Sequence, residues 1–198
     1  RSISTGATLR GRIGAYLRHG AIQALQTIVG ANDATDALLE FQDHPSAAVR
    51  RALVITLRRL KSPAIANFLE DAEEGIVIET IQAINYAYIE GARPALAKLT
   101  DWLGRSTPMI DYRIINAIFR VGGQDGIRQI LKLLSDESLS PEVRMECLFV
   151  LNRWENPPVA DPTTGKVRPV SGDREIGPLR PEMVKVLKDL LDQAEGEL

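Results

Sequence analysis

The chain has 198 residues, of which 44% are hydrophobic and only 5% aromatic, a composition that favours closely packed helices over a sheet protein. Its 24 Lys and Arg residues against 26 Asp and Glu residues give a net charge of -2, without the basic excess that phosphate-backbone binding needs. We therefore expect no nucleic-acid partner. No apolar run is long enough for membrane insertion, and the single cysteine excludes an intrachain disulfide.

A twelve-residue pattern recurs five times along the chain. Its copies begin at Leu17, Val49, Ile78, Ile110 and Val143, which are 32, 29, 32 and 33 residues apart. Positions one, five, eight, nine and twelve of each copy fall on one face of a helix with 3.6 residues per turn, so the pattern predicts five amphipathic helices. Position nine is held by Leu25, Leu57, Tyr86, Ile118 and Leu151.

A second apolar-periodic segment follows each of the first four copies. These segments cover residues 33–41, 63–72, 93–103 and 125–134, and Gly or Pro residues separate them from the helices before them. One such helical hairpin cannot bury its own apolar face, so it must stack on the next hairpin. We therefore predict one all-α domain, an α-solenoid over residues 1–198, with repeats near 14–44, 45–74, 75–106, 107–138 and 139–198.

The fifth repeat is interrupted between residues 155 and 179. This stretch contains five prolines, so a continuous helix is impossible there and extended or turn conformations dominate. A helical pattern resumes at Arg180 and predicts the delayed partner helix that closes the stack. Its apolar stripe consists of Met183, Val184, Val186, Leu187, Leu190 and Leu191.

Three interpretations of the insertion remain open: a solvated excursion, a strap packed along the repeats, and a segment that binds a partner. Five apolar residues favour the strap over the solvated excursion, because water would otherwise surround them; they are Val159, Val167, Val170, Ile176 and Leu179. If the insertion binds a partner, the candidate interaction loop consists of Pro157, Pro158, Lys166, Arg168 and Arg174.

Position eleven of the pattern carries an arginine in three copies: Arg59, Arg120 and Arg153. Stacking of the repeats would align these residues as a ridge that could meet an anionic partner. Alternatively, the arginines pair with acidic side chains between repeats and pack their stems on neighbours. Both interpretations stay open at this point.

Reactive groupings are sparse. Cys147 occupies a core-facing position, which predicts a buried and unreactive thiol. His19 and His44 have no third ligand at a recognisable spacing, and the Gly165-Lys166 pair lacks the glycine spacing of a phosphate-binding loop. We therefore predict no catalytic, cofactor or metal site, and a protein that is not an enzyme.

Two segments carry a family resemblance. "DHPSAAVRRALVITLRRLKSPAIANFLED" and "DESLSPEVRMECLFVLNRW" resemble HEAT repeats, with an acidic loop, a Val-Arg pair and an Ala/Leu-rich first helix. The resemblance covers residues 16–154 and implies that the arginine of the pair supports packing between repeats. Glu79 and Asp111 replace this arginine in the third and fourth repeats, so the resemblance implies a less regular stack there.

The insertion resembles a loop in the HEAT-like region of large proteins from planctomycetes and verrucomicrobia, which join a sorbosone-dehydrogenase-like propeller to a c-type haem domain. The matching residues are Trp154, Pro157, Pro158, Asp161, Gly165, Arg168, Pro169 and Arg174. This resemblance implies a fragment of a larger protein in the periplasm or cell envelope, acting as a spacer or docking arm of a membrane-bound dehydrogenase. Neither the propeller nor a haem motif lies in this sequence, so no redox chemistry is assigned to it.

These observations lead to three functional hypotheses. The first is a non-catalytic scaffold that binds protein partners without a cofactor. The second is a DNA-binding repair glycosylase with HEAT-like repeats, whose groove would use Arg50, Arg58, Arg59 and Arg120, against the unfavourable net charge. The third is a bilin-lyase-like protein that binds a chromophore.

Overall fold

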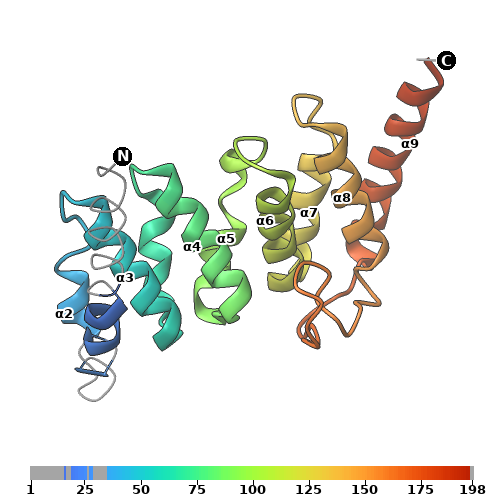
Figure 1. Ribbon diagram of the computed structural model, residues 1–198. Coiled ribbons are helices and arrows are strands. Elements are labelled where there is room, and N and C mark those ends of the chain that lie inside the picture. Colours follow the sequence, from blue (N-terminus) through green and yellow to red (C-terminus); the bar gives the residue numbers. More distant parts are fainter. Residues whose placement is uncertain (1–15, 17–18, 26, 29–34, 197–198) are drawn as a thin grey trace, which may run out of the picture. The chain divides into compact units, whose positions relative to one another are not determined.

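The computed structural model describes residues 16, 19–25, 27, 28 and 35–196. Across these residues the regular elements are helices, and the one β-type pairing is an isolated bridge between Ala160 and Val167 (Figure 1). The predicted all-α class is therefore confirmed. The chain divides into two compact units, residues 1–92 and 93–198, so the boundary lies inside the predicted third repeat of residues 75–106.

The first unit is built around two long helices, α3 (Ala47–Leu60) and α4 (Glu74–Ala87). A short helix α2 (Thr35–Leu39) precedes them, and the 3₁₀ helices η1 (Pro63–Glu70) and η2 (Glu90–Ala92) follow each in turn. α3 packs against α4, and η1 contacts both of them. The alternation of a long helix with a shorter element agrees with the predicted hairpins.

The second element of the second repeat differs in type from the prediction. The segment at 63–72 forms the 3₁₀ helix η1, and its buried residues Ile65 and Phe68 are three positions apart. Three residues make one 3₁₀ turn, so these two side chains point to the same side and reach the core together. Ser62 caps the element by accepting a hydrogen bond from the Ala64 amide at 3.4 Å.

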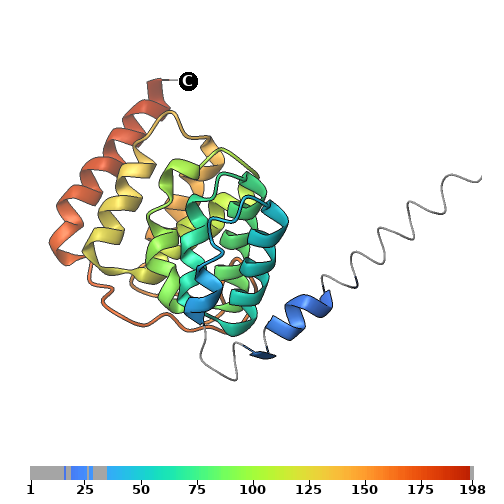
Figure 2. The same ribbon diagram turned by 90° about the vertical axis from the view of Figure 1, so that its left-hand side faces the viewer.

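The second unit is centred on α6. Its elements are α5 (Arg93–Ala97), η3 (Thr100–Trp102), α6 (Pro108–Val121), α7 (Gly123–Leu134), α8 (Pro141–Asn152), η4 (Gly177–Leu179) and α9 (Arg180–Gly196). α6 packs against α5, α7 and α8, and 10 of its 14 residues are buried. A helix covered on so many sides is the core of its unit. Figure 2 shows α7 and α9 on the same side of this unit.

The first repeat is described only in part. Residues 19–25, 27 and 28 are helical, in agreement with the helix predicted from Leu17, but Leu17 itself lies outside the described residues. Ile28 was expected in the buried stripe and is instead 58% exposed. Leu25, at position nine, is half-buried.

The predicted register of the third repeat is wrong by two residues. Tyr86 was placed at position nine with Leu57, but Tyr86 is 46% exposed, and the buried equivalent of Leu57 is Ile84. The helix ends explain the shift, because Lys61 and Tyr88 both adopt the left-handed conformation that terminates α3 and α4. The amides that follow close matching bonds, Ser62 to the Leu57 carbonyl and Ile89 to the Ile84 carbonyl.

The apolar stripe of α9 is only partly used for packing. Met183 is buried at 9% exposure, whereas Val184 and Leu191 are 60% and 67% exposed. The expectation that the whole stripe closes the stack is therefore wrong for these outer residues. They lie on the flank of the helix turned away from Met183, about 80 to 100° around its axis.

No helix in the described part of the chain combines the length and the apolar character that a membrane span requires.

We predict that Lys61→Gly stabilises the first unit. Lys61 has φ 53° and ψ 33°, a conformation that glycine adopts without the steric cost of a Cβ atom. The free energy of unfolding should rise by about 1 kcal/mol, measured by chemical denaturation. Lys132→Gly is the matched control, because Lys132 is an exposed residue within α7 and its replacement should cost about 1 kcal/mol. Destabilisation by both variants would contradict the assigned cap.

Candidate functional site: the strap and the α8 surface

Residues 155–179, named the strap here, fold back onto α6. The strap begins with a tight turn around Asp161, whose carbonyl accepts the Gly165 amide at 2.7 Å. The Asp161 carboxylate accepts the amide and the hydroxyl of Thr163 at 2.9 and 2.6 Å. Arg168 then donates its amide to the Val159 carbonyl at 2.9 Å. These bonds give a segment without a helix its own local order.

A buried ion pair joins this turn to α6. Nη1 of Arg120 lies 3.3 Å from Oδ2 of Asp161, and the two side chains are 3% and 1% exposed. Arg120 also donates to the Arg168 carbonyl at 2.7 Å, and Asn116 donates to Thr163 at 3.3 Å. Burial raises the pKa of the Asp161 carboxyl, but the Thr163 hydrogen bonds and the Arg120 charge outweigh burial, so its pKa is lowered overall.

A second anchor, Arg174, closes the far end of the strap. Its guanidinium donates to the carbonyls of Phe119 and Arg120, two of the last acceptors of α6. A cation at this position satisfies carbonyls that have no partner within the helix. The guanidinium also lies over the rings of Phe119 and Trp154, at 4.9 and 5.1 Å from their centroids.

Glycines permit the close approach at this anchor. Gly122 has φ 75°, and a Cβ atom there would lie 3.1 Å from the Arg174 guanidinium. The Gly123 amide donates to the Asp173 carbonyl at 3.3 Å. Trp154 is fully buried against Gly126, where a Cβ atom would come within 3.0 Å of the indole ring. The backbone at the end of α6 thus lies in direct contact with the strap, without a side chain between them.

The candidate interaction loop is therefore divided between anchors and exposed residues. Arg174 is an anchor, the Arg168 carbonyl receives Arg120, and Pro157 and Pro158 are half-buried. Lys166 is exposed. The structure agrees with the strap interpretation, but two of the valines that favoured it point to solvent: Val159 and Val167 are 62% and 75% exposed.

The three arginines of position eleven have different environments. Arg120 is 7% exposed and its guanidinium is used within the unit, so it belongs to the pairing alternative and not to an exposed ridge. Arg153 is half-buried, with its guanidinium 5.7 Å from the centroid of the Phe149 ring. Arg59 is half-buried in the first unit and has an interaction of its own.

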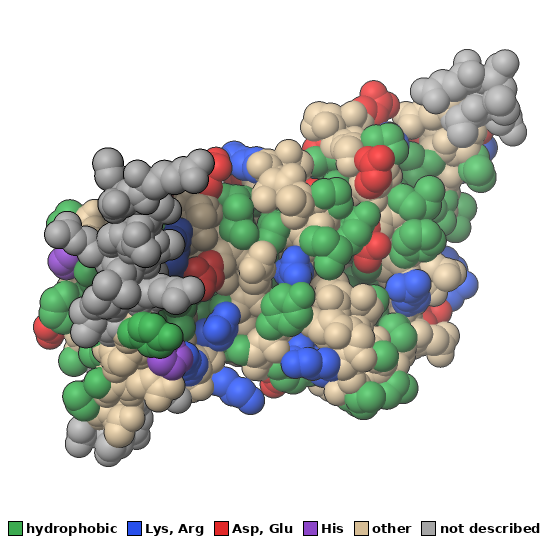
Figure 3. All heavy atoms as spheres, viewed as in Figure 1, with side chains coloured by type: hydrophobic (Ala, Val, Ile, Leu, Met, Phe, Trp, Pro, Cys, Tyr) green, Lys and Arg blue, Asp and Glu red, His purple; other side chains and the backbone are tan. Residues whose placement is uncertain are grey.

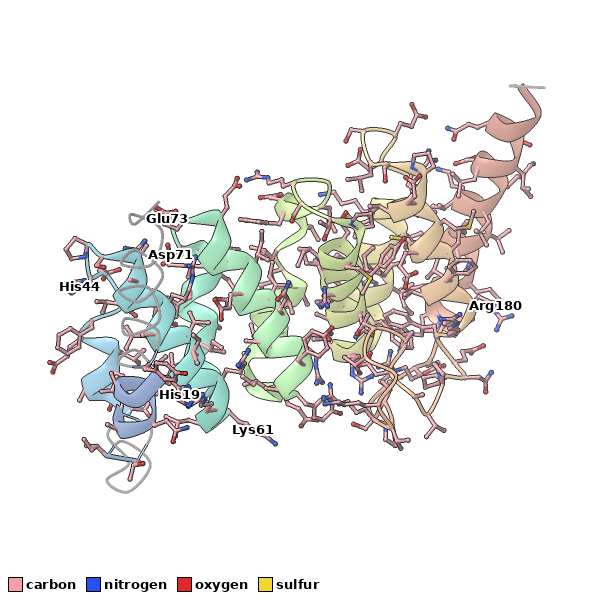
Figure 4. All side chains as sticks on the ribbon, viewed as in Figure 1. His19, His44, Lys61, Asp71, Glu73 and Arg180 are labelled. Carbon is pink, nitrogen blue, oxygen red and sulfur yellow. The ribbon has the colours of Figure 1, made fainter. Side chains whose placement is uncertain are left out.

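The arginine of the Val-Arg pair links each helix to a neighbouring loop. In the first unit Arg50 forms a two-pronged ion pair with Asp71, at 2.7 and 2.9 Å, in the turn before α4. Asp71 and Glu73 are labelled together at this turn in Figure 4. Arg144 donates to the Leu134 carbonyl at 3.0 Å in the second unit. Asp111, which replaces the arginine, accepts the Gly104 amide at 3.1 Å instead.

The Arg50–Asp71 pair borders a hollow of about 680 Å³ in the first unit. Asp43 and Glu70 also line it. Arg50 is the basic member of this lining, and its guanidinium is already held by Asp71 and by the His44 carbonyl at 2.7 Å. The charged side chains Arg50 and Asp71 at this hollow therefore already have a structural role, which is to link the loops to α3.

An exposed apolar surface lies over α8. We name it the α8 surface and define it by the exposed Met145 and Phe149, the half-buried Tyr112, Glu146 and Leu187, and the buried Met183, which lines one of its hollows. Phe149 borders both of its hollows, one of about 290 Å³ between α6 and α8 and one of about 410 Å³ between α8 and α9. Figure 3 shows hydrophobic side chains gathered over α8 and α9 with acidic side chains among them.

The charges around this surface are ordered along α8. Glu142 and Glu146 flank the hollow next to α6, and among the described residues neither belongs to an ion pair. Burial raises the pKa of Glu146, while the Arg153 charge opposes this rise. Arg180, labelled in Figure 4, projects outward at the start of α9.

The residues weighed for chemistry remain apart. Cys147 is fully buried, as expected, and burial raises the pKa of its thiol to about 12. His44 accepts the Ser46 amide at 3.0 Å, and His19 contacts Gln23 at 3.2 Å. Within the described residues, no cluster of three His, Cys, Asp or Glu side chains could hold a metal ion.

Sequence reasoning missed Asn116 and the surface role of Met145 and Phe149. Asn116 is a buried polar residue within the apolar segment "IINAIF", and that signal could have pointed to a polar partner elsewhere in the chain. Met145 and Phe149 lie opposite the predicted core stripe of α8 and four residues apart, so the sequence already placed two large apolar side chains together on the outer face of the helix.

No family model, curated protein or solved structure matches this chain.

We predict a strong coupling between Arg120 and Asp161. Asp161→Asn leaves the Arg120 charge buried without its counter-ion and should cost about 3 to 5 kcal/mol of unfolding free energy. The double variant Arg120→Met, Asp161→Leu removes both charges and should recover part of that loss, because the buried charge is gone but the Arg168 carbonyl and the Thr163 amide lose these partners. Chemical denaturation measures both, and additive costs in the double variant would contradict the pairing.

The same pair should make stability depend on pH. Because the folded pKa of Asp161 lies below the unfolded value of about 4, its contribution is fully present above pH 4 and is lost as the pH falls through the folded pKa. The difference in unfolding free energy between the wild type and Asp161→Asn should therefore shrink below about pH 4. Subtracting the variant cancels the parallel effect of Asp71, whose pKa is also lowered, mainly by its hydrogen bond from Arg50. A difference that stays constant down to pH 2 would count against the ion pair.

Proposed function

We propose that this chain is a non-catalytic helical-repeat scaffold of the HEAT type that binds protein partners through the α8 surface. The observation that carries the proposal is the position of Phe149, which is 47% exposed and borders two adjoining hollows. An exposed aromatic ring between two apolar hollows is the arrangement that anchors a protein partner.

Two large apolar side chains on α8 are exposed to water. Met145 and Phe149 are 49% and 47% exposed. The free energy of binding becomes more favourable by about 25 cal/mol for each Å² of apolar surface that is removed from water. Met145 and Phe149 border the same hollow, so one partner can cover them together, whereas scattered apolar residues would not allow this.

The HEAT assignment is supported by the local geometry of the repeats. Arg50 and Arg144 stand at the same position of their helices; Arg50 donates to a carbonyl in the loop before α3, and Arg144 donates to the last carbonyl of α7. α3 and α4 also end in the same left-handed cap. The contacts of the two arginines fit the packing role that the resemblance implies for the Val-Arg pair.

The placement in a larger redox protein of the cell envelope is part of the same proposal. Its support is the strap, since three residues of the resembling loop have defined roles there. Asp161 pairs with Arg120, Arg174 caps α6, and Trp154 packs under Arg174. A loop motif that fixes a strap suits a rigid spacer between other domains.

We predict that a photo-crosslinking amino acid in place of Phe149 gives a discrete adduct with one protein or domain in the producing cells. The same group in place of Val167, which is 75% exposed on the strap, should give no such adduct. Phe149→Ser should reduce co-purification of that partner about tenfold, because a buried aromatic anchor is lost. Identical adducts from both positions, or substrate turnover by the isolated chain, would contradict the proposal.

A further inference from the structure

One face of α8 carries an ordered series of side chains. Glu142, Met145, Phe149 and Arg153 follow one another at intervals of three or four residues, so they lie along a single stripe of the helix. Glu146 borders the same hollow as Glu142 and Phe149. The stripe is therefore acidic in its first half, apolar at its centre and basic at its end.

The order of charges along this stripe is complementary to the same stripe running in the opposite direction. Glu142 and Arg153 are about 16 Å apart along the axis, and the midpoint between them falls near Cys147 and Leu148. When a second copy of the stripe lies antiparallel across that midpoint, acidic residues face Arg153 at both ends. Phe149 then lies next to the Met145 side chain of the other copy.

We propose that the α8 surface binds a second copy of this chain, with the two α8 helices antiparallel about a two-fold axis. The proposal rests on the proposed function, because it names the partner of the same surface. Each charge contact occurs twice in such an isologous pair, so one stripe supplies both halves of the interface. On α9, Met183 and Leu187 border the hollow beside Phe149 and add apolar area to the same surface.

Charge complementarity favours a second copy over a simpler occupant. A basic peptide would satisfy Glu142 and Glu146 but would bring like charge against Arg153, which stands over the Phe149 ring. An acidic peptide would have the opposite defect. A surface that contains both signs in this order is matched by its own reversed copy.

The same charges also suit the dipole of α8, because acidic residues stand near its first turn and a basic residue follows its end. Deleting a charge would therefore affect both the helix and the interface. An exchange of charges between two chains separates these effects, since only the interface can recover when the chains are mixed.

The test uses sedimentation equilibrium on the full chain. The wild type should dimerise. The double variant Glu142→Lys/Glu146→Lys and the single variant Arg153→Glu should each weaken dimerisation about tenfold to a hundredfold. An equimolar mixture of these two variants should form a heterodimer to about the wild-type extent. Lys132→Glu and Asp101→Lys, which change exposed charges elsewhere in the same unit, should leave dimerisation unchanged.

Three outcomes would overturn the inference. The first is a wild type that remains monomeric up to about 1 mM. The second is a dimer that neither charge variant weakens, because it then forms through another face. The third is a mixture that does not recover. If a crosslink from position 149 still reaches a different protein or domain, the scaffold function stands and only the second copy fails; if that crosslink is also absent, both fail.

Discussion

The buried ion pair between Arg120 and Asp161 is the constraint on which the second unit depends. Removing two charges from water costs several kcal/mol for each, so such a pair persists only where further hydrogen bonds complete its shell. Asn116 and Thr163 donate to the Asp161 carboxylate, and Arg120 donates to the Arg168 carbonyl, so each charge has hydrogen-bond partners besides the other. Apolar contacts are not directional, so they could have held the strap in several positions. The charged groups need particular hydrogen-bond partners and therefore hold the strap in one position. The segment that interrupts the fifth repeat is therefore a connection between α8 and α9 with one defined conformation.

The strap is attached at a different place from the apolar surface on α8. Its 25 residues are attached to the end of α6 through Asp161 and Arg174, and the chain then returns to begin α9. Met183 reaches the core, but most of the α9 stripe does not, and a hollow remains between α8 and α9. Phe149 stands at the edge of that hollow. The anchors of the strap thus lie on α6, whereas the hollow beside Phe149 lies between α8 and α9.

Much of the helical order could be predicted from the sequence, because the burial of one stripe per helix imposes a period on the apolar residues. α3, α6 and α8 fall close to their predicted positions for this reason. The third repeat was misregistered because Lys61 and Tyr88 end their helices without the glycine that normally marks such an end. The strap anchors were beyond reach for a different reason: Asn116 and Arg120 on one side and Asp161 on the other are more than 40 residues apart, and no periodicity joins them.

Native-state hydrogen exchange measured by NMR tests the central claim most directly. The amides of Asp161, Gly165 and Arg168 are hydrogen-bonded only within the strap turn, to the Lys166, Asp161 and Val159 carbonyls. If the Arg120–Asp161 pair holds the strap in place, these three amides exchange on the order of a hundredfold more slowly than in an unstructured peptide, and Asp161→Asn removes that protection while α6 stays protected. Exchange at the unstructured rate in the wild type would contradict the account.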